Sequence, residues 1–290
     1  MPDSHGAMRQ SGLKIAAVAH IFYQEVWPEM AQHLRCLPDG SSLFITTSNM
    51  SFLPDVLKDF PDATIIETAN VGRDVAPFIQ LLPELQRFDI VCKIHTKGRA
   101  AWRAELLRGV LPNRQIVDRI IKAFAEDDRL ALLGSKALYL NGPLRLTGKN
   151  DWFPRYAGAV PAQFGFFGGT MFWCRPAVFS ELSLTVSAED FQPHNDFNGH
   201  AEHAIEAVFG VIAARKKCNI GLVDTRRFSW RRLRIVPSSY LGETNFKKNL
   251  RHLWDDGHLP SRHPLKRLRK NASRLFKPRH ARSFLGAIFF

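Results

Sequence analysis

Polar side chains that could bind an anion or transfer a proton follow an apolar segment near residue 90. Residues 89–94 read as a buried strand, and His95, Thr96 and Lys97 come directly after it. In open α/β sheets, ligands bind just beyond the carboxyl ends of the strands. Lysine and histidine can both donate hydrogen bonds to a diphosphate, and histidine can also transfer protons near neutral pH. We therefore predict a site at His95 and Lys97; the alternative is a solvated loop that carries charges.

A turn about 20 residues upstream could contribute to the same site. Gly72 can adopt a positive φ and lets the backbone approach a ligand. Arg73 could bind a phosphate or carboxylate through its two-pronged guanidinium. Asp74 could cap the helix that the following apolar spacing predicts. The simpler interpretation of Asn70-x-Gly72 is an ordinary turn with a helix cap behind it.

Residues 165–175 read G-F-F-G-G-T-M-F-W-C-R and combine aromatic side chains with a glycine pair. Aromatic rings beside such a flexible pair suit stacking on a sugar ring or a base. Packing in the core is the more common use of these residues, and both interpretations stay open.

Acidic and histidine side chains gather at the head of a predicted helix over residues 201–215. His203 and Glu206 are three residues apart and share a helix face. They could form a metal pair, but no third ligand is evident, so a carboxylate acting as a general base is the better prediction. Asp190 and Asp196, upstream, compete with Glu206 for that role.

The order of apolar segments predicts an α/β fold with a mostly parallel sheet. Strands are expected at 14–19, 42–47, 63–67, 89–94, 130–134 and 220–224, and helices at 25–36, 75–85, 116–125 and 201–215. Strands that alternate with helices indicate βαβ units. The alternation stops near residue 226, so we expect a domain over residues 12–225 and an extension over 226–290.

The charge of the chain is concentrated in that extension. The formal net charge is +13, yet residues 1–225 hold 23 Lys and Arg against 24 Asp and Glu, whereas residues 226–290 hold 17 against 3. Leucine and phenylalanine are interspersed among these basic residues, a composition that favours binding to an anionic membrane surface. Nucleic acid would also be attracted, although no recognition motif accompanies the charge. A merely solvated tail is the third interpretation.

Cysteine usage and hydropathy indicate the compartment. The four cysteines are far apart and lack metal-ligand spacing, which predicts reduced thiols and neither a zinc site nor a disulfide framework. The N-terminus lacks the apolar segment of a secretory signal, and the apolar runs are too short to cross a bilayer. We expect a cytoplasmic protein, peripheral at most on the inner face of the membrane.

Several of these segments together resemble the rhamnan synthesis protein F family of bacterial polysaccharide glycosyltransferases. The matching residues are His20 to Tyr23 with Trp27, Asn70-Val-Gly-Arg-Asp74 with Pro77-Phe78, Lys93-Ile-His-Thr-Lys97, Trp102-Arg103, Gly168 to Arg175, and His203-Ala-Ile-Glu206. The resemblance spans residues 14–225, and the basic tail lies outside it. It implies transfer of a sugar, typically rhamnose from a dTDP donor, during assembly of O-antigen or another cell-envelope polysaccharide.

The segment order is also similar to that of GT-A glycosyltransferases, with one departure. The strand that ends in Asp-x-Asp in those enzymes ends here in His95-Thr-Lys97. The acid pair normally holds a divalent metal against the donor diphosphate, so cations in its place suggest transfer without metal.

The resemblance gives each candidate residue an expected role. Donor binding is assigned to Asn70, Arg73, Asp74, His95 and Lys97; the acceptor side to Thr170, Trp173 and His203; and catalysis to Glu206, Asp196 and His95, with no metal ligand. The expected partners are a nucleotide sugar and a lipid-linked glycan acceptor, and we expect inversion of the anomeric carbon because no nucleophile stands out. Two other classes stay open: a non-catalytic glycan-binding module of polysaccharide assembly, and a nucleic-acid-binding protein driven by the tail.

Overall fold

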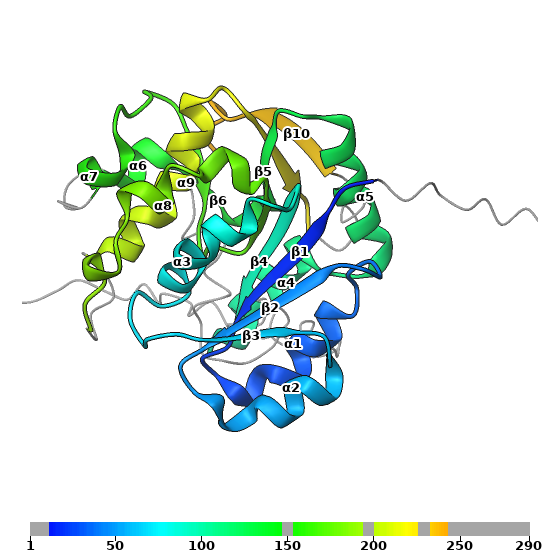
Figure 1. Ribbon diagram of the computed structural model, residues 1–290. Helices are drawn as coiled ribbons and strands as arrows, with labels where there is room; N and C mark the ends of the chain where they lie inside the picture. The colour runs from blue at the N-terminus through cyan, green and yellow to red at the C-terminus, as the bar shows by residue number, and fades with distance from the viewer. Residues whose placement is uncertain (1–11, 147–152, 194–199, 226–232, 243–290) are drawn as a thin grey trace, which may run out of the picture.

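The computed structural model describes residues 12–146, 153–193, 200–225 and 233–242 (Figure 1). Within these residues, one mixed sheet of eight strands has the order β10-β9-β5-β8-β4-β1-β2-β3, and β6 and β7 form a separate pair. The strands are β1 (Ile15–His20), β2 (Ser42–Thr47), β3 (Thr64–Glu67), β4 (Ile90–His95), β5 (Leu130–Ser135), β6 (Tyr139–Asn141), β7 (Gly165–Phe167), β8 (Phe172–Cys174), β9 (Asn219–Val223) and β10 (Leu233–Pro237). The prediction of an α/β fold with a mostly parallel sheet is confirmed, and the arrangement is consistent with a GT-A-like fold.

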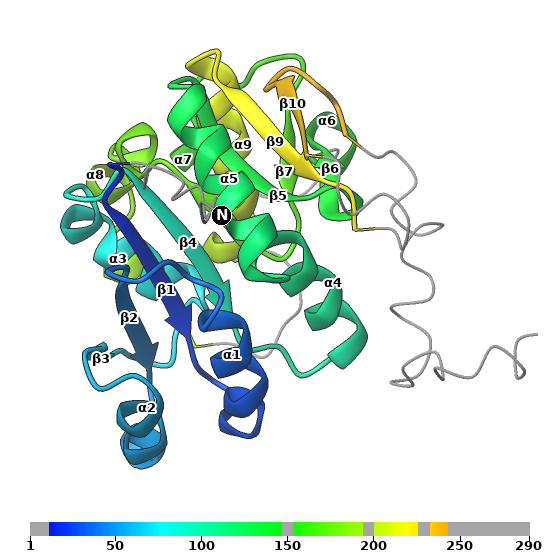
Figure 2. The ribbon, with the colours of Figure 1, turned by 90° about the vertical axis from the view of Figure 1, so that its right-hand side faces the viewer.

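Helices cover both faces of the large sheet, as the two views show (Figures 1 and 2). They are α1 (Trp27–Leu34), α2 (Leu53–Asp59), α3 (Val75–Leu85), α4 (Ala100–Val110), α5 (Arg114–Glu126), α6 (Gly142–Leu146), α7 (Phe153–Ala157), α8 (Leu182–Thr185) and α9 (Ala201–Arg215). Helices α3, α7, α8 and α9 pack on one face, and α1, α2, α4 and α5 pack on the other. Successive residues of β1 alternate between the two cores because side chains of a strand point to opposite faces.

The direction of winding reverses between β1 and β4. Strands β2 and β3 follow β1 on one side, whereas β4 lies parallel to β1 on its other side. Ligands of open α/β sheets bind at such a switch point, beyond the carboxyl ends of the strands. The fold therefore places the predicted site of His95 and Lys97 where its topology favours ligand binding.

The glycine-rich segment around Gly168 connects two different sheets. Strand β7 pairs with β6, whereas β8 lies antiparallel between β4 and β5. The turn Gly168–Thr170 therefore opens at the carboxyl edge of β4, because β8 runs against it. Helix α9 packs so closely on β7 that a Cβ on Gly210 would lie 2.1 Å from the carbonyl oxygen of Gly165. A glycine at this position allows α9 to bring its first turns to the same edge.

Two features differ from the sequence-based expectation. Strand β10 pairs antiparallel with β9, so the sheet continues past residue 225, where we had ended the domain. The apolar pattern did not predict β10 because it is an edge strand. Its residues Arg234 and Ile235 are exposed, so the strand lacks a continuous apolar run. Helix α4 was also not expected, since Arg103 and Glu105 interrupt its apolar face; both are buried through polar partners.

Candidate active site

A buried ion pair lies at the centre of the candidate site, just behind the carboxyl end of β4. The side chain of Lys93 is 1% exposed. Its ammonium donates to the carboxylate of Asp74, to the carbonyl oxygen of Thr170 at 3.0 Å and to the Thr170 hydroxyl oxygen at 3.2 Å. The Thr170 hydroxyl donates to the same carboxylate. All three donor positions of the ammonium are thus used, which a buried charge requires.

This geometry corrects the role expected for Asp74. Its backbone occupies the N-cap position of α3, but its side chain makes no capping hydrogen bond. The carboxylate instead points to Lys93 and Thr170. Burial alone would raise the pKa of Asp74, but the charge that His95 gains when it is protonated in acid, the charge of Lys93, and the hydrogen bonds from Lys93 and Thr170 hold it well below its usual range. The Asp74 side chain thus pairs with the charged ammonium of Lys93 instead of accepting a hydrogen bond from the backbone N–H groups of α3.

The two turns that bring Asp74 and Thr170 together adopt unusual backbone conformations. Gly72 and Arg73 have φ of 62° and 55°, and Gly169 and Thr170 have φ of 86° and 49°. A non-glycine residue in this left-handed region costs roughly 1–3 kcal/mol and persists where the surroundings enforce it. Here the Lys93 cluster enforces it, and two of the three such non-glycine residues in the described chain lie at this site.

Two histidines lie side by side at the ends of the central strands. His20 and His95 are register partners on β1 and β4. Nδ1 of His20 lies 3.0 Å from the Thr46 hydroxyl oxygen, and Nδ1 of His95 lies 3.3 Å from the Asp74 carboxylate. Burial, aided by the charge of Lys93, lowers the pKa of His20 to about 4 and that of His95 to about 3, against the opposing effect of Asp74.

His95 is therefore neutral at physiological pH, which corrects its expected role as a cation. With this pKa, the buried imidazole carries no positive charge at neutral pH in the ligand-free protein. It can accept or donate a hydrogen bond, and its Nδ1 faces the Asp74 carboxylate. The basic side chains near this edge of the sheet are Lys97, Arg73 and Arg99.

Lys97 and Glu206 form the more accessible part of the site. Burial lowers the pKa of Lys97, while Asp74 and Glu206 oppose that effect and Arg73 and Arg99 add to it. Burial raises the pKa of Glu206, against the hydrogen bond from the Gly169 N–H and the charge of Lys97. A carboxylate with a raised pKa that is held by a backbone donor has the properties of a general base.

Helix α9 also contacts the turn that holds Arg73. Nε of Arg73 lies 3.7 Å from the carboxylate of Glu202, which is buried in the first turn of α9. The His203 ring lies 3.7 Å from the same carboxylate. The two ends of the expected site, which are about 130 residues apart in the sequence, are thus in contact.

Exposed aromatic rings flank the site beyond the end of β1. Phe22 and Tyr23 are 48% and 38% exposed. The Thr96 hydroxyl oxygen accepts hydrogen bonds from both of their backbone N–H groups, each at 2.9 Å. These rings are therefore held at the site by a residue of the His95-Thr-Lys97 segment.

Most of the residues predicted from the sequence converge here, but not all. The structure brings together Asp74, His95, Lys97, Thr170 and Glu206. Arg73 and His203 lie beside this group, and both contact the carboxylate of Glu202. Asn70 is exposed in the preceding bend. Asp196 lies outside the described residues. Asp190 is a structural residue, because its side chain accepts from the Ser187 N–H and pairs with Arg155 at 2.8 Å.

Trp173 does not belong to the site, contrary to our expectation of an acceptor contact. It is fully buried on the opposite face of β8 and donates from Nε1 to the carbonyl oxygen of Val110 at 2.9 Å. The turn before β8 faces the site, and the strand itself enters the core.

Three residues of the site were given no role by sequence reasoning: Lys93, His20 and Thr96. For Lys93 a signal existed, because a lysine inside the apolar run of β4 requires a buried partner. For His20, the pairing with His95 follows from strand register, which the sequence does not display.

The donor set does not fit a divalent cation. Asp74 is engaged by Lys93 and Thr170, and Lys97 adds positive charge beside it. Among the described residues, no group of three His, Cys, Asp or Glu side chains could hold a metal ion.

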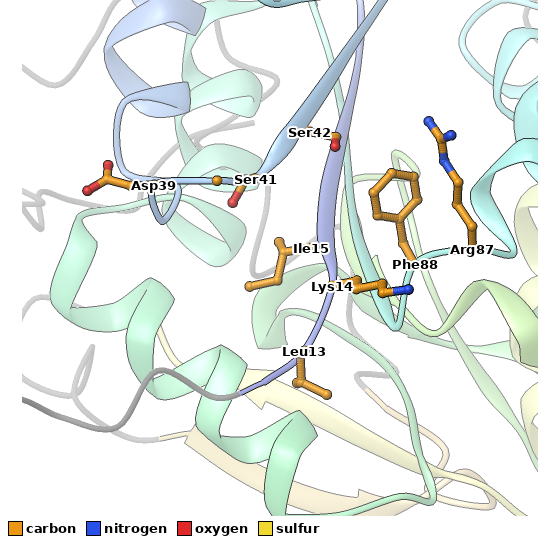
Figure 3. A pocket seen from close by; sticks show the side chains of 9 residues that line it. Leu13, Lys14, Ile15, Asp39, Ser41, Ser42, Arg87 and Phe88 are labelled. Atoms are coloured by element: carbon orange, nitrogen blue, oxygen red, sulfur yellow. The ribbon is translucent and has the colours of Figure 1, made fainter.

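A separate pocket lies at the other edge of the sheet (Figure 3). It is lined by the starts of β1 and β2, including Lys14 and Ser42, and by Arg87 and Phe88. Because these are the amino ends of parallel strands, the pocket is not part of the candidate active site.

Comparison with known proteins supports the family resemblance. Residues 3–139 match the family model described as rhamnan synthesis protein F. The expected resemblance is thereby confirmed over this stretch. It includes the segments around Asp74, His95 and Arg103, whereas Thr170 and Glu206 lie beyond the matched residues. The match indicates a part in rhamnan or related polysaccharide synthesis. No curated protein matches the chain.

The buried histidines predict that stability falls in weak acid. Between the unfolded pKa of about 6.5 and the folded values of about 4 and about 3, the unfolded chain binds more protons. The free energy of unfolding should therefore decrease as pH falls from about 6.5 to 4, by up to about 1.4 kcal/mol per pH unit for each histidine. Urea unfolding at several pH values measures this slope.

Substitutions assign the slope to these groups. His20→Gln and His95→Gln should each remove about one proton from the difference between the two states. A slope that stays the same in both variants would contradict the assignment.

Proposed function

We propose that this protein is a glycosyltransferase that transfers rhamnose from dTDP-rhamnose to a growing lipid-linked cell-envelope polysaccharide, such as O-antigen or rhamnan. The observation that carries the proposal is the placement of Lys97 close to both Arg73 and the half-buried carboxylate of Glu206, at the switch point of the sheet. The match to a rhamnan synthesis family supports the substrate class.

On the donor side, Lys97 and Arg73 bind the diphosphate. Both side chains are cations, and Arg73 projects from a turn whose conformation brings it toward α9. The exposed rings of Phe22 and Tyr23 offer a surface on which the planar base can stack. Asp74 acts indirectly, because its carboxylate holds Lys93 and Thr170 in place rather than contacting the donor.

On the acceptor side, Glu206 takes the proton of the attacking hydroxyl. That oxygen forms a bond to the anomeric carbon, while the bond from the anomeric carbon to the diphosphate oxygen breaks. The electron pair leaves with dTDP, whose added negative charge Lys97 and Arg73 stabilise. A single displacement of this kind inverts the anomeric configuration. Asp196 remains the alternative base, and Thr170 and His203 border the acceptor.

Donor turnover and donor binding should separate in two variants. Glu206→Gln should lower kcat for hydrolysis of dTDP-rhamnose by about 10²–10⁴-fold because the general base is lost, and it should keep the rise in Tm that dTDP-rhamnose causes. Lys97→Ala should lose most of that rise, because a ligand stabilises the folded state only as far as it binds.

Exposed residues supply the controls: Glu189→Gln and Lys58→Ala remove the same charges away from the site. Wild-type protein that binds the donor without turnover is a non-catalytic module. A sugar product with retained configuration would overturn the single displacement.

Transfer should proceed without a divalent metal, because Lys97 and Arg73 supply the charge that the metal otherwise provides. Metal-stripped protein is expected to keep its full rate of dTDP-rhamnose hydrolysis in EDTA. Loss of activity in EDTA that magnesium or manganese restores would contradict this.

We also propose that the basic C-terminal segment holds the enzyme at the inner face of the cell membrane. Most of this segment lies outside the described residues, and the proposal rests on its 17 Lys and Arg against 3 acidic residues. Among the described residues, no helix is long and apolar enough to cross a bilayer. Each basic residue near an anionic leaflet contributes about 1 kcal/mol.

The membrane proposal predicts co-sedimentation with phosphatidylglycerol vesicles at low salt, weakening as salt rises, and none with phosphatidylcholine vesicles. A chain that ends at Gly242 keeps β10 and should lose this binding. Unchanged co-sedimentation of the shortened chain would refute the proposal. Salt-dependent binding to duplex DNA in place of vesicles would support a nucleic-acid partner instead.

A further inference from the structure

Helix α4 holds Lys97 from two sides. Nη1 of Arg103 donates a hydrogen bond to the carbonyl oxygen of Lys97. The ammonium of the same lysine lies 4.5 Å from the centroid of the Trp102 ring. Adjacent residues of one helix thus fix both the backbone and the charged end of Lys97.

Arg103 is itself anchored. Its Nε and Nη2 donate to the carboxylate of Glu29 on α1, at 3.0 and 2.7 Å. The guanidinium uses its planar fork for Glu29 and its remaining nitrogen for the Lys97 carbonyl, an arrangement that a lysine cannot reproduce. The loop after β4 is therefore tied to two helices on one face of the sheet.

The Trp102 indole also borders the turn that holds Glu206. A Cβ on Gly169 would lie 3.3 Å from Nε1 of Trp102. The Gly169 N–H donates to the Glu206 carboxylate. One indole thus lies between the cation of the donor side and the turn that holds the base.

The surroundings of Lys97 include groups that favour its charged form and groups that disfavour it, so an additional contact that stabilises the ammonium matters. Burial and the nearby Arg73 and Arg99 disfavour its charged form, whereas Asp74 and Glu206 favour it. A cation on an aromatic face is stabilised most when both are shielded from water. The Trp102 ring therefore favours the charged form of Lys97, as Asp74 and Glu206 do.

We infer that Trp102 and Arg103 are positioning residues that hold the ammonium of Lys97 at the carboxyl edge of the sheet, where the leaving diphosphate would meet it. The diphosphate part of this inference rests on the proposed function. The hold on Lys97 does not, and it can be measured without any substrate.

Titration of Lys97 tests the Trp102 contact directly. Reductive ¹³C-methylation of the folded protein labels the lysines, and the Lys97 signal is identified by its loss in Lys97→Arg. In Trp102→Leu its titration midpoint should fall by about 0.5–1.5 pH units, because the ring no longer stabilises the cation. Trp102→Phe keeps an aromatic face and should restore most of the midpoint. An unchanged midpoint in Trp102→Leu, with a native circular dichroism spectrum, would overturn the inference.

Hydrogen exchange tests the Arg103 contact. Arg103→Lys keeps the charge beside Glu29 but loses the fork, so amides of residues 96–99 should exchange faster than in the wild type. Arg108→Lys is the matched control, because Arg108 is exposed on the same helix and donates within it, to the Ala104 carbonyl. Equal exchange at residues 96–99 in the two variants would overturn this part.

Affinity for dTDP separates this inference from the proposed function. Trp102→Leu should bind dTDP about 3- to 30-fold more weakly than the wild type, with Trp102→Phe in between. Wild-type protein that does not bind dTDP, with a midpoint that still shifts in Trp102→Leu, contradicts the proposed function and leaves the positioning role intact. Wild-type protein that binds dTDP, with no shift in the midpoint in Trp102→Leu, contradicts the positioning role and leaves the proposed function intact.

Discussion

The ion pair between Lys93 and Asp74 is the constraint on which the rest of the site depends. Lys93 lies in the middle of the sheet, between two apolar cores, and an unpaired charge there would cost several kcal/mol. Its three donors are satisfied by residues from two other segments, the turn before α3 and the turn before β8. Each of those turns accepts a left-handed residue to reach the ammonium. Local backbone strain is thus offset by the pairing of one buried charge.

This constraint divides the charged residues of the site into two groups. Asp74 and Lys93 neutralise each other, and His95 beside them is kept neutral by burial. Lys97 and Glu206 lie near each other at the edge of the sheet, where burial lowers the pKa of Lys97 and raises that of Glu206, and each group opposes that effect on the other. The buried group fixes the geometry, and the outer group places an amine and a carboxyl group at the edge of the sheet. The departure from Asp-x-Asp is consistent with this division, since the carboxylate of Asp74 is already engaged by Lys93 and Thr170.

The scaffold places these groups through two close approaches. Strand β8 enters antiparallel between β4 and β5, which turns its leading loop toward the carboxyl edge. Helix α9 approaches β7 at a glycine, so its first turns reach that loop, and Glu206 accepts from Gly169. On the other face, α4 supports the loop after β4 through Arg103 and Trp102. The turn that holds Glu206 and the helix that supports Lys97 thereby meet at the loop after β4.

The sequence by itself determined the alternation of strands and helices, the polar end of β4, and the family resemblance, because these depend on local periodicity and on short motifs. Pattern also brought Arg73, Lys97 and Glu206 forward as candidates. Only the tertiary structure decided what the side chains do. In the structure, Asp74 forms an ion pair and does not cap its helix, and Trp173 lies in the core. Burial keeps His95 neutral, and β10 belongs to the sheet. Side-chain partners, burial and strand neighbours depend on contacts between residues far apart in the chain, and local sequence does not encode which of several possible partners comes within reach.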